Sequence, residues 1–484
     1  PPPPPPPFSS RRRHTRLLTQ SRGLGDVYKR QTHIFGKGGL QESSGEGGSI
    51  DQAALFKSIT GYNKIVERTD YLGQVLRQAS AVLHSSSPAP VLLSLPFNVQ
   101  SELVDDAILQ EIRSKPRRPR LHQGSPQIEA ACRAIAAARR PVIIAGHGCL
   151  RARAQELVER LSSSLNIPVA TSLKAKGVIS ERSPLSLGSL GVTSNGYAYR
   201  YLVEQADLLL FLGAGFNERT SYLWDRQLLQ HKQIVQIDND HGQLEKVFAA
   251  DIAIHSDIGE ALRAMLAAIA AAGLQRKRSV EFDGRDALRE GAAGDDSSVS
   301  SSKFALLESF FSRLEQQFPA DLQVFDDNII FAQNFFHVSS RNRYYPNSGI
   351  SSLGQAIPAA IGARFAAPKP TFAILGDGGF QMCCMEIMTA VNYRLPLNVV
   401  VLNNATMGLI RKNQHQQYHG RYIDCDFVNP DYRALARSFA IGYQKISSEE
   451  DLDALFRDFD LVEAINLIEI VIDKNAFPNY RSGR

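Results

Sequence analysis

The stretch that decides the fold reads TFAILGDGGF at residues 371–380 and LNVVVLNN at residues 397–404. The apolar runs 371–375 and 397–402 are short and partly β-branched, which is typical of buried strands in a parallel sheet. Residues 382–393 have the length and the apolar spacing of a helix. The segment therefore predicts a strand–helix–strand crossover, with Asp377 and Asn404 each where a strand gives way to a loop.

Asp377 and Asn404 lie 27 positions apart, and both carry side-chain oxygens. Because the carboxyl ends of parallel strands meet at one edge of a sheet, these oxygens beside a glycine turn suit a hard cation and the phosphates that accompany it. Magnesium suits the site best, since it takes few protein oxygens and leaves positions for phosphate oxygens. A lone Gly-Asp-Gly is usually an ordinary turn, so the correctly spaced Asn pair makes the pattern specific.

This pattern resembles the GDG…NN signature of the thiamine diphosphate-dependent enzymes, and the tail Ala405-Thr406-Met407-Gly408 agrees with it. The resemblance runs from about residue 32 to the C-terminus. It implies an α/β fold of three blocks, with parallel sheets flanked by helices and an incomplete first domain. Further stretches are similar to the acetolactate synthase-like branch of that family: residues 88–96, 172–177, 185–188, 213–216 and 354–363.

Two linkers separate the three blocks. Residues 115–120 are basic and Pro-rich, and residues 273–303 are rich in Gly, Ser, Arg and Asp, so neither can build a core. With the resemblance, we expect residues 1–31 to be a non-native or disordered leader, 32–113 the C-terminal part of a pyrimidine-binding domain, 125–272 a central Rossmann-like domain, 273–303 a linker and 304–484 a diphosphate-binding domain. The apolar patterns predict a helix over 71–83 and strands over 90–96, 141–145, 167–171, 207–212 and 233–237.

Length and charge bound the possible functions. A chain of 484 residues with 43% hydrophobic residues is long enough for two or three domains. Its formal net charge of +5 does not indicate nucleic-acid binding, because residues 1–31 alone carry six Arg and one Lys against one Asp. That leader lacks the apolar core of a signal peptide and looks like translated vector DNA.

Cysteine usage favours a reducing cytoplasm. The five cysteines show no metal-ligand spacing and no disulfide framework. Cys383 and Cys384 lie on the predicted crossover helix and are expected to pack in the core. No apolar run reaches the length of a membrane span, so no membrane partner is expected.

The resemblance also implies roles for single residues. The side-chain oxygens of Asp377 and Asn404 and the backbone carbonyl of Thr406 would hold magnesium. Leu353 would support the cofactor in a bent shape, although core packing would explain it better without the resemblance. The stretch Asp326-Asp327-Asn328 could form an ordinary turn. The expected cofactor-binding residues are Asn328, Ser351, Leu353, Gly376, Gly378, Gly379, Asn404, Met407 and Gly408.

The first departure from the family pattern concerns the glutamate that polarises the cofactor. Its segment would lie upstream of residue 32, and Glu42, Glu46 and Glu67 do not stand in a matching context, so each is expected at the surface. We therefore expect a truncated gene product with little or no activity.

Two further departures concern flavin and substrate. Gly215 and Asn217 stand where flavin-using members carry Arg and Asp, and a usual His is missing just after residues 190–193, so bound flavin adenine dinucleotide is doubtful. Asn413 stands where biosynthetic acetolactate synthases carry a Trp, which widens the range of possible substrates. Residues 146–148 and Asp238 resemble parts of a dinucleotide site, but the full glycine fingerprint is missing, so plain structure explains them better.

The combined interpretation is an enzyme that uses thiamine diphosphate and Mg²⁺ to decarboxylate a 2-oxo acid and to ligate the product to a second carbonyl. A 2-oxo acid decarboxylase of the same family is the main alternative. A non-catalytic cofactor-binding or oligomer-forming protein is another, and a nucleotide-dependent oxidoreductase built on residues 125–272 is less favoured. The resemblance implies a homodimer or tetramer.

Overall fold

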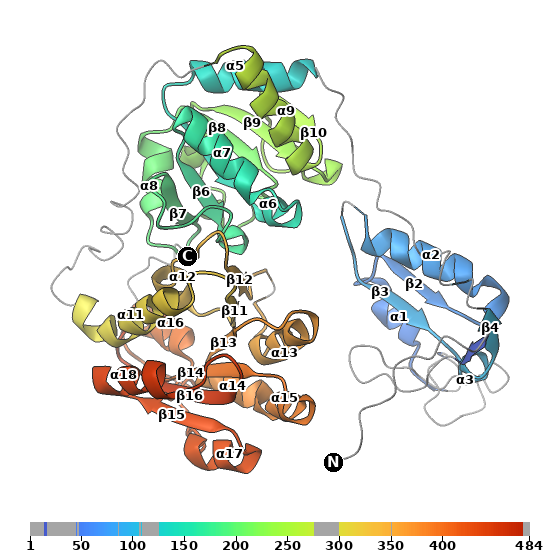
Figure 1. Cartoon of the computed structure of the whole chain (residues 1–484), viewed down its shortest axis with the longest axis vertical. Helices are drawn as coiled ribbons and strands as arrows, with labels where there is room; N and C mark the ends of the chain where they lie inside the picture. Colours follow the sequence, from blue (N-terminus) through green and yellow to red (C-terminus); the bar gives the residue numbers. More distant parts are fainter. Residues whose placement is uncertain are drawn as a thin grey trace. The chain divides into compact units, whose positions relative to one another are not determined.

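The computed structural model describes residues 14–16, 45, 48–85, 87–105, 108, 125–274, 300–349 and 351–477. The chain divides into two compact units, Pro1–Pro119 and Arg120–Arg484. The second unit contains two six-stranded sheets, in which all neighbouring strands pair in parallel (Figure 1). The predicted α/β class, with parallel sheets flanked by helices, is confirmed.

The first unit is built around a parallel pair of strands, β2 and β3. Helix α2 contributes Leu72 and Val75 to a small core that also contains Val66 and Val99. The predicted helix 71–83 and strand 90–96 are confirmed as α2 and β3. Within the expected leader, residues 14–16 form β1, which pairs antiparallel with β4. The other residues of 1–31 lie outside the described residues. The elements are β1 (His14–Arg16), α1 (Gln52–Lys57), β2 (Tyr62–Ile65), η2 (Thr69–Tyr71), α2 (Leu72–Leu83), β3 (Val91–Ser94), α3 (Phe97–Gln100) and β4 (Leu103–Asp105).

The central sheet has the strand order β10-β9-β8-β5-β6-β7. The strands predicted over 141–145, 167–171, 207–212 and 233–237 are confirmed as β5, β6, β8 and β9. Two strands were not predicted, because β7 reads SLGSL and β10 reads IAIH, and neither is a continuous apolar run. The elements are α5 (Pro126–Ala137), β5 (Pro141–Ala145), α6 (His147–Arg151), α7 (Gln155–Leu165), β6 (Val169–Ser172), η3 (Leu173–Ala175), β7 (Ser186–Leu190), α8 (Tyr197–Glu204), β8 (Leu208–Leu212), η4 (Arg226–Leu228), β9 (Gln233–Asp238), η5 (His241–Gln243), β10 (Ile252–His255) and α9 (Ile258–Ala271).

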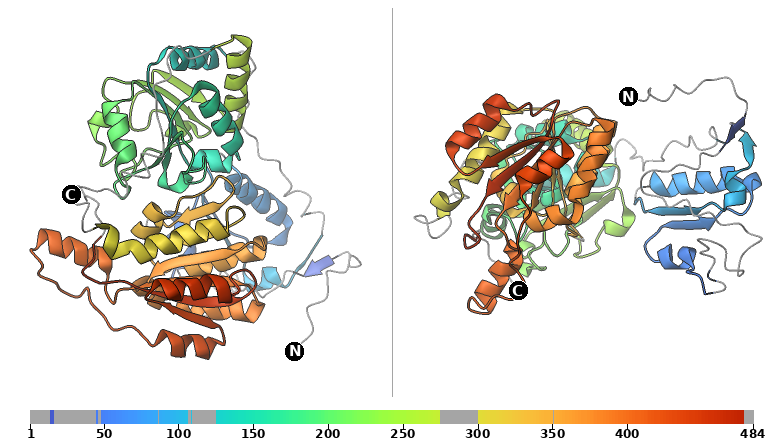
Figure 2. Two further views of the ribbon diagram at one scale, coloured as in Figure 1. Left: turned by 60° about the vertical axis from the view of Figure 1, so that its left-hand side comes forward. Right: turned by 90° about the horizontal axis from the view of Figure 1, so that it is seen from below.

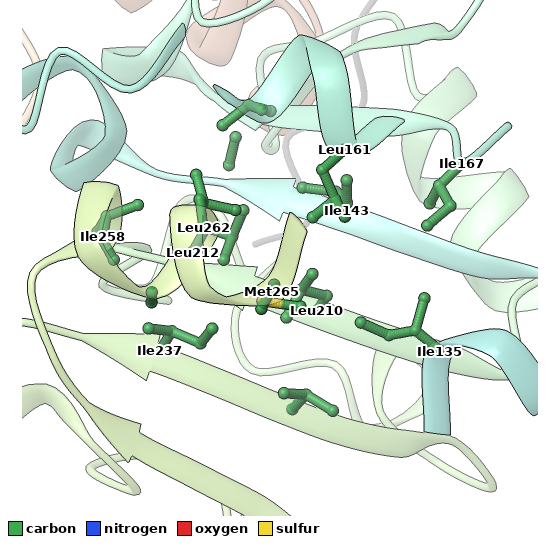
Figure 3. Packing of buried hydrophobic residues seen from close by; sticks show 14 of the residues in the cluster. Ile135, Ile143, Leu161, Ile167, Leu210, Leu212, Ile237, Ile258, Leu262 and Met265 are labelled. Carbon is green, nitrogen blue, oxygen red and sulfur yellow. The ribbon is translucent and has the colours of Figure 1, made fainter. Parts of the chain in front are cut away.

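Both faces of the central sheet are covered, which explains why its inner strands are apolar without alternation. On one face, Ile143 and Leu210 pack with Leu161 of α7 and with Leu262 and Met265 of α9 (Figure 3). The alternate residues of the same strands face the other way and pack with α8 in a second cluster. Successive side chains of a strand therefore serve two separate cores.

The C-terminal sheet has the order β12-β11-β13-β14-β16-β15. Residues of α11 and α18 pack on one face, and residues of α13, α15 and α17 pack on the other (Figure 2). The elements are α11 (Ser300–Gln317), β11 (Gln323–Asp326), α12 (Ile330–Phe335), β12 (Arg343–Pro346), α13 (Ala356–Ala366), β13 (Thr371–Gly376), α14 (Asp377–Cys383), η6 (Cys384–Glu386), α15 (Ile387–Tyr393), β14 (Leu397–Asn403), α16 (Gly408–Gln417), α17 (Tyr432–Phe439), β15 (Gly442–Ile446), α18 (Glu449–Asp458) and β16 (Ile465–Val471). Helix α11 begins inside the linker expected over 273–303, and residues 275–299 lie outside the described residues.

The crossover between β13 and β14 is present, but its helix differs from the prediction. The single helix expected over 382–393 is divided into α14, η6 and α15, and α14 begins at Asp377 directly after β13. Gly378 and Gly379 are poor helix formers, which is why the sequence placed the helix start after them. Asp377 therefore lies at a strand-to-helix junction and not in a loop.

The strand orders place a topological switch point in each sheet. In the C-terminal sheet, the chain runs outward from β11 to β12 and then returns to β13 on the other side of β11. The segments that follow β11 and β13 therefore leave the sheet edge in opposite directions, which is where open α/β sheets bind ligands. In the central sheet the equivalent switch point lies between β5 and β8.

Candidate cation and phosphate site

The carboxylate of Asp377 is buried where β13 ends and α14 begins. Its Oδ1 accepts a hydrogen bond from the N–H of Gly378 (3.0 Å), and its Oδ2 accepts from the N–H groups of Asn404 (3.1 Å) and Ala405 (2.6 Å). The structure thus brings Asp377 and Asn404 together, because β13 and β14 are neighbours that end at one edge. Burial raises the pKa of Asp377, and the hydrogen bonds oppose that rise.

The loop after β14 folds tightly at this edge. Ala405 has a φ of 53°, in the left-handed region, and Asn404 Oδ1 accepts from the N–H of Thr406 (3.2 Å). The Thr406 hydroxyl donates to the carbonyl of Cys425 (2.8 Å). Met407 caps α16, which begins at Gly408, so the expected residues from 404 to 408 all lie at the site edge.

The glycines lie where segments approach closely. A Cβ at Gly378 would lie 2.5 Å from Met407 Sδ, and a Cβ at Gly408 would lie 2.9 Å from Asn404 Nδ2. Gly376 is the N-cap of α14. A glycine has no Cβ, so a phosphate oxygen can also approach a backbone of this kind closely.

Asp327 ties the loop after β12 to the glycine turn. Its carboxylate accepts from the N–H of Gly354 (2.7 Å) and of Gln355 (3.2 Å). A Cβ at Gly379 would lie 2.6 Å from Asp327 Oδ2 and 3.8 Å from the Cβ of Leu353, so the half-buried Leu353 lies beside the glycine turn. Ser351 lies on the same loop, with a left-handed φ of 56°.

Asp326, the last residue of β11, is buried beside three donors. Its carboxylate accepts from the hydroxyl of Tyr344 (2.6 Å), from Nε2 of Gln333 (3.3 Å) and from the N–H of Ile329. Burial raises the pKa of Asp326 to about 7, and these hydrogen bonds oppose the rise. Asp326 and Asp327 are therefore satisfied by internal donors, which supports the interpretation of residues 326–328 as a structural turn.

Asn328 follows this turn with a left-handed φ of 65°, and it contacts the central domain. Its Oδ1 accepts from Nη1 of Arg219 (3.3 Å) and from Nε2 of Gln333 (3.5 Å). Gln333 also contacts the central domain. Its Oε1 accepts from the hydroxyl of Thr193 (2.9 Å), and its backbone carbonyl accepts from Nζ of Lys176 (2.8 Å). A contact of Asn328 with a diphosphate stays a prediction.

Sequence reasoning missed Asn429, which lies 52 residues after Asp377. Its Nδ2 donates to Asp377 Oδ2 (2.8 Å) and to Asn403 Oδ1 (2.8 Å), while its Oδ1 accepts from Nε2 of Gln381 (2.8 Å). Asn403 in turn donates through Nδ2 to Oε1 of the buried Glu469 (2.7 Å). Asn429 lies outside any helix or strand, so periodicity could not single it out. The only indication in the sequence was Asn403, which had no expected role and whose side chain accepts from Asn429.

The donor set suits the magnesium that the resemblance implies. Asp377 offers a carboxylate, Asn404 an amide oxygen and Thr406 a backbone carbonyl, and Mg²⁺ prefers such hard oxygens. Within the described ranges, no group of three or more His, Cys, Asp or Glu side chains could hold a metal ion. A cation at this edge would therefore depend on one carboxylate, neutral oxygens and phosphate oxygens, which is a usual arrangement for Mg²⁺.

The glycines of the central domain are explained by its own packing. A Cβ at Gly146 would lie 2.1 Å from the carbonyl oxygen of Gly213, and a Cβ at Gly148 would lie 2.7 Å from the Cα of Gly213. Asp238 is buried and accepts from the N–H of Asp240 (2.9 Å), so it caps the turn after β9. These contacts support the structural interpretation of residues 146–148 and Asp238.

The remaining expected positions are placed as follows. Asn217 Oδ1 accepts from the N–H of Thr220 (3.1 Å) and so caps a turn. Glu67 is exposed, whereas Glu42 and Glu46 lie outside the described residues. Asn413 is half-buried on α16, and its Oδ1 has no hydrogen-bond partner within the described part of the chain.

The state of the cysteines and the character of the helices complete the description. All five cysteines are free, and Cys383 and Cys384 pack in the core around α14, as predicted. Among the described helices, none combines the length and the apolar character needed to cross a membrane.

Comparison with known proteins agrees with this geometry. Residues 128–265 match the family "Thiamine pyrophosphate enzyme, central domain", and residues 328–470 match "Thiamine pyrophosphate enzyme, C-terminal TPP binding domain". Thiamine pyrophosphate is the same compound as thiamine diphosphate. The two matches together span more than half of the 484 residues, and the second contains the proposed magnesium ligands Asp377, Asn404 and Thr406.

Curated relatives point to one branch of this family. A probable acetolactate synthase large subunit of Methanocaldococcus jannaschii is 28% identical over 454 residues, which cover 91% of this chain and 75% of that protein. The mitochondrial acetolactate synthase of Schizosaccharomyces pombe is 27% identical, covering 91% of this chain and 68% of that protein. The acetolactate synthase isozyme 2 large subunit of Escherichia coli is 26% identical, covering 89% and 77%. The chain therefore belongs to the thiamine pyrophosphate-dependent enzymes, in their acetolactate synthase-like branch.

Proposed function

We propose that this protein binds thiamine diphosphate through Mg²⁺, decarboxylates a 2-oxo acid and ligates the product to a second carbonyl compound. The observation that carries the proposal is the buried Asp377 carboxylate, which accepts from the N–H groups of Asn404 and Ala405 beside the glycines of α14. When bound, the cofactor supplies the electron sink that both steps need.

Each residue of the site would have a limited task. Asp377, Asn404 and the Thr406 carbonyl would hold Mg²⁺, and the backbone of Gly378 and Gly379 would face the diphosphate. The other expected contacts, at Asn328, Ser351, Leu353, Gly376, Met407 and Gly408, would position the rest of the cofactor. This assignment is supported by the single sheet edge at which β13 and β14 end.

Substitution of Asp377 by Ala tests the cofactor assignment. We expect the wild-type protein to bind thiamine diphosphate only when Mg²⁺ is present. Asp377→Ala should weaken that binding by more than about 100-fold, since even loss of a residue that only hydrogen-bonds a metal ligand costs about 10- to 100-fold. Isothermal titration calorimetry measures both affinities. Equal affinity in the variant would show that the site is elsewhere.

The alternative within the family is simple decarboxylation of the 2-oxo acid. The names of the relatives favour ligation, because acetolactate is formed by joining two carbonyl compounds. Product analysis with pyruvate separates the two reactions, since ligation yields acetolactate and decarboxylation alone yields acetaldehyde. The assay is needed for this chain and for any longer product of its gene.

We further propose a homodimer or tetramer in a reducing cytoplasm, with a central domain that is architectural. The free cysteines support a reducing compartment, and the internal packing of Gly146 and Gly213 supports an architectural central domain. The homodimer or tetramer is proposed from the family resemblance. Size-exclusion chromatography with light scattering measures the assembly. A visible absorption spectrum of the purified protein tests for flavin, and a stoichiometric flavin band would contradict the architectural role.

A further inference from the structure

Residues 425–429, which we call the brace, run along the loop that follows β14. The N–H of Met407 donates to the carbonyl of Cys425 (2.7 Å), and the N–H of Phe427 donates to the carbonyl of Ala405 (3.1 Å). Thr406 and Asp426 form an antiparallel bridge between these two hydrogen bonds. The brace therefore holds the loop that carries the Asn404 and Thr406 oxygens.

The end of the brace reaches the other half of the site. Asn429 Nδ2 donates to Asp377 Oδ2 over 2.8 Å, so one short segment contacts both the β13–α14 junction and the loop after β14. Asp377 is 1% exposed, which means that water cannot replace this donor freely.

A buried carboxylate determines which way the Asn429 amide points. Glu469 offers only acceptor oxygens when ionised, so Asn403 must turn its Nδ2 toward Glu469 Oε1 (2.7 Å) and its Oδ1 toward Asn429. Asn429 then has to present Nδ2 to both Asn403 and Asp377, while its Oδ1 accepts from Gln381 (2.8 Å). The reversed amide would place an oxygen against the Asp377 carboxylate.

The brace itself is anchored away from the site. Arg411 of α16 is buried, and its Nη1 donates to both carboxylate oxygens of Asp426 at 2.9 Å. Its guanidinium also lies 3.7 Å from the ring centroid of Tyr422. Two interactions of a rigid, planar group therefore limit the movement of the brace relative to α16.

We propose that Asn429 is a positioning residue of the cation site, which fixes the orientation of the Asp377 carboxylate relative to the Asn404–Thr406 loop. This inference rests on the proposed function. Mg²⁺ demands short bonds in near-ideal octahedral geometry, whereas Ca²⁺ accepts longer bonds and irregular geometry. A carboxylate that keeps its backbone donors but loses Asn429 is held less firmly, and it should therefore lose Mg²⁺ affinity more than Ca²⁺ affinity.

The test measures two cation affinities by calorimetry in the presence of saturating thiamine diphosphate. We expect Asn429→Ala to lower Mg²⁺ affinity about 10-fold or more, as the loss of other residues that hydrogen-bond a metal ligand does, and to lower Ca²⁺ affinity less. Asn429→Asp has the same shape but places a carboxylate against Asp377, so it should weaken Mg²⁺ binding at least as much. Gln381→Ala, at an exposed position, provides a milder variant in which only the orientation of Asn429 is loosened.

Asn334→Ala is the matched control. Asn334 is half-buried like Asn429, and its Nδ2 likewise donates two hydrogen bonds, to the carbonyls of Thr193 and Ile330 (both 2.9 Å). The ratio of Mg²⁺ to Ca²⁺ affinity should be unchanged in this control and reduced in the Asn429 variants. Suppose that the wild type binds Mg²⁺ and Asp377→Ala does not. An unchanged ratio of Mg²⁺ to Ca²⁺ affinity in Asn429→Ala would then overturn the role of Asn429 and leave the proposed function standing. If the wild type binds no Mg²⁺, the proposed function falls as well.

Discussion

At the scale of single residues, Asp326 couples the fold to pH. Its pKa is raised to about 7 by burial, so the folded protein holds a proton that the unfolded chain releases. The stability from this proton is fully present below the ordinary pKa of an aspartate, about pH 4, and is lost as the pH rises to about 7. Above that pH the contribution is constant.

Asp326→Asn removes this dependence because the amide cannot ionise. We expect the free energy of unfolding of the wild type, relative to the variant, to fall between about pH 4 and about pH 7, with a slope that approaches about 1.4 kcal/mol per pH unit. Urea denaturation at a series of pH values measures the difference. A difference that rises with pH over this window would contradict the assignment of the buried proton.

Residues with a local pattern were predictable, and residues defined by distant contacts were not. Asp377 and Asn404 follow apolar strands at a regular spacing, so the sequence alone predicts that they lie at one edge of the sheet, as they do. Asn429 and Glu469 act through partners on other elements, at sequence separations of 52 and 66 residues. A long-range hydrogen bond leaves no periodicity in the sequence, which is why these two were missed.

At the scale of elements, the first turn of α14 packs against one side chain that is held in place and one that is flexible. A Cβ at Gly379 would lie 2.6 Å from the Asp327 carboxylate, which Gly354 and Gln355 hold in place. A Cβ at Gly378 would instead meet the end of the flexible Met407 side chain. An added methyl group can therefore be accommodated more easily at Gly378 than at Gly379, because Met407 can move and the Asp327 carboxylate is held in place.

We expect Gly379→Ala to lower the free energy of unfolding by about 1–3 kcal/mol, the usual cost of overpacking, and Gly378→Ala to cost less. Thermal and urea denaturation measure both variants under the same conditions. Equal effects would mean that the Asp327 carboxylate moves as easily as the Met407 thioether.

The same junction shows where element boundaries escape prediction. The strands on either side of α14 were found because they are uniformly apolar, whereas the helix start was displaced by two glycines that tertiary contacts require. Strands β7 and β10 were not predicted because β7 contains Ser and Gly and the apolar run of β10 is only three residues long before His255. Strand identity was therefore predictable where burial on both faces made the strand continuously apolar.

At the scale of the whole second unit, a buried ion pair joins the central and C-terminal domains. Nζ of Lys176 lies 2.8 Å from Glu181 Oε2, with side chains 2% and 4% exposed. Lys176 also donates to the carbonyl of Gln333 (2.8 Å), and Glu181 accepts from the N–H of Val338 (2.9 Å). Lys176 and Glu181 are close in sequence, but Gln333 and Val338, to which they bond, each lie 157 residues further along the chain. This contact between the domains was therefore not predictable from the sequence.

Lys176→Met should destabilise the second unit strongly. It leaves the Glu181 carboxylate buried without its cation, and such a change costs about 3–5 kcal/mol. The double variant Lys176→Met/Glu181→Leu removes both charges and is expected to recover part of the loss. Calorimetric unfolding of the three proteins measures this coupling, and a double variant less stable than Lys176→Met would contradict it.

The position of β16 has a consequence for the order in which the site can form during synthesis. It is the last strand of the described residues in sequence, yet it lies between β14 and β15 inside the sheet. Glu469 on this strand is connected to Asp377 by hydrogen bonds through Asn403 and Asn429. A nascent chain that has left the ribosome only as far as Gly408 therefore carries the complete signature without the frame that orients it. If the proposed cofactor binds at this site, it would therefore stabilise the finished C-terminal domain more than such a partial chain.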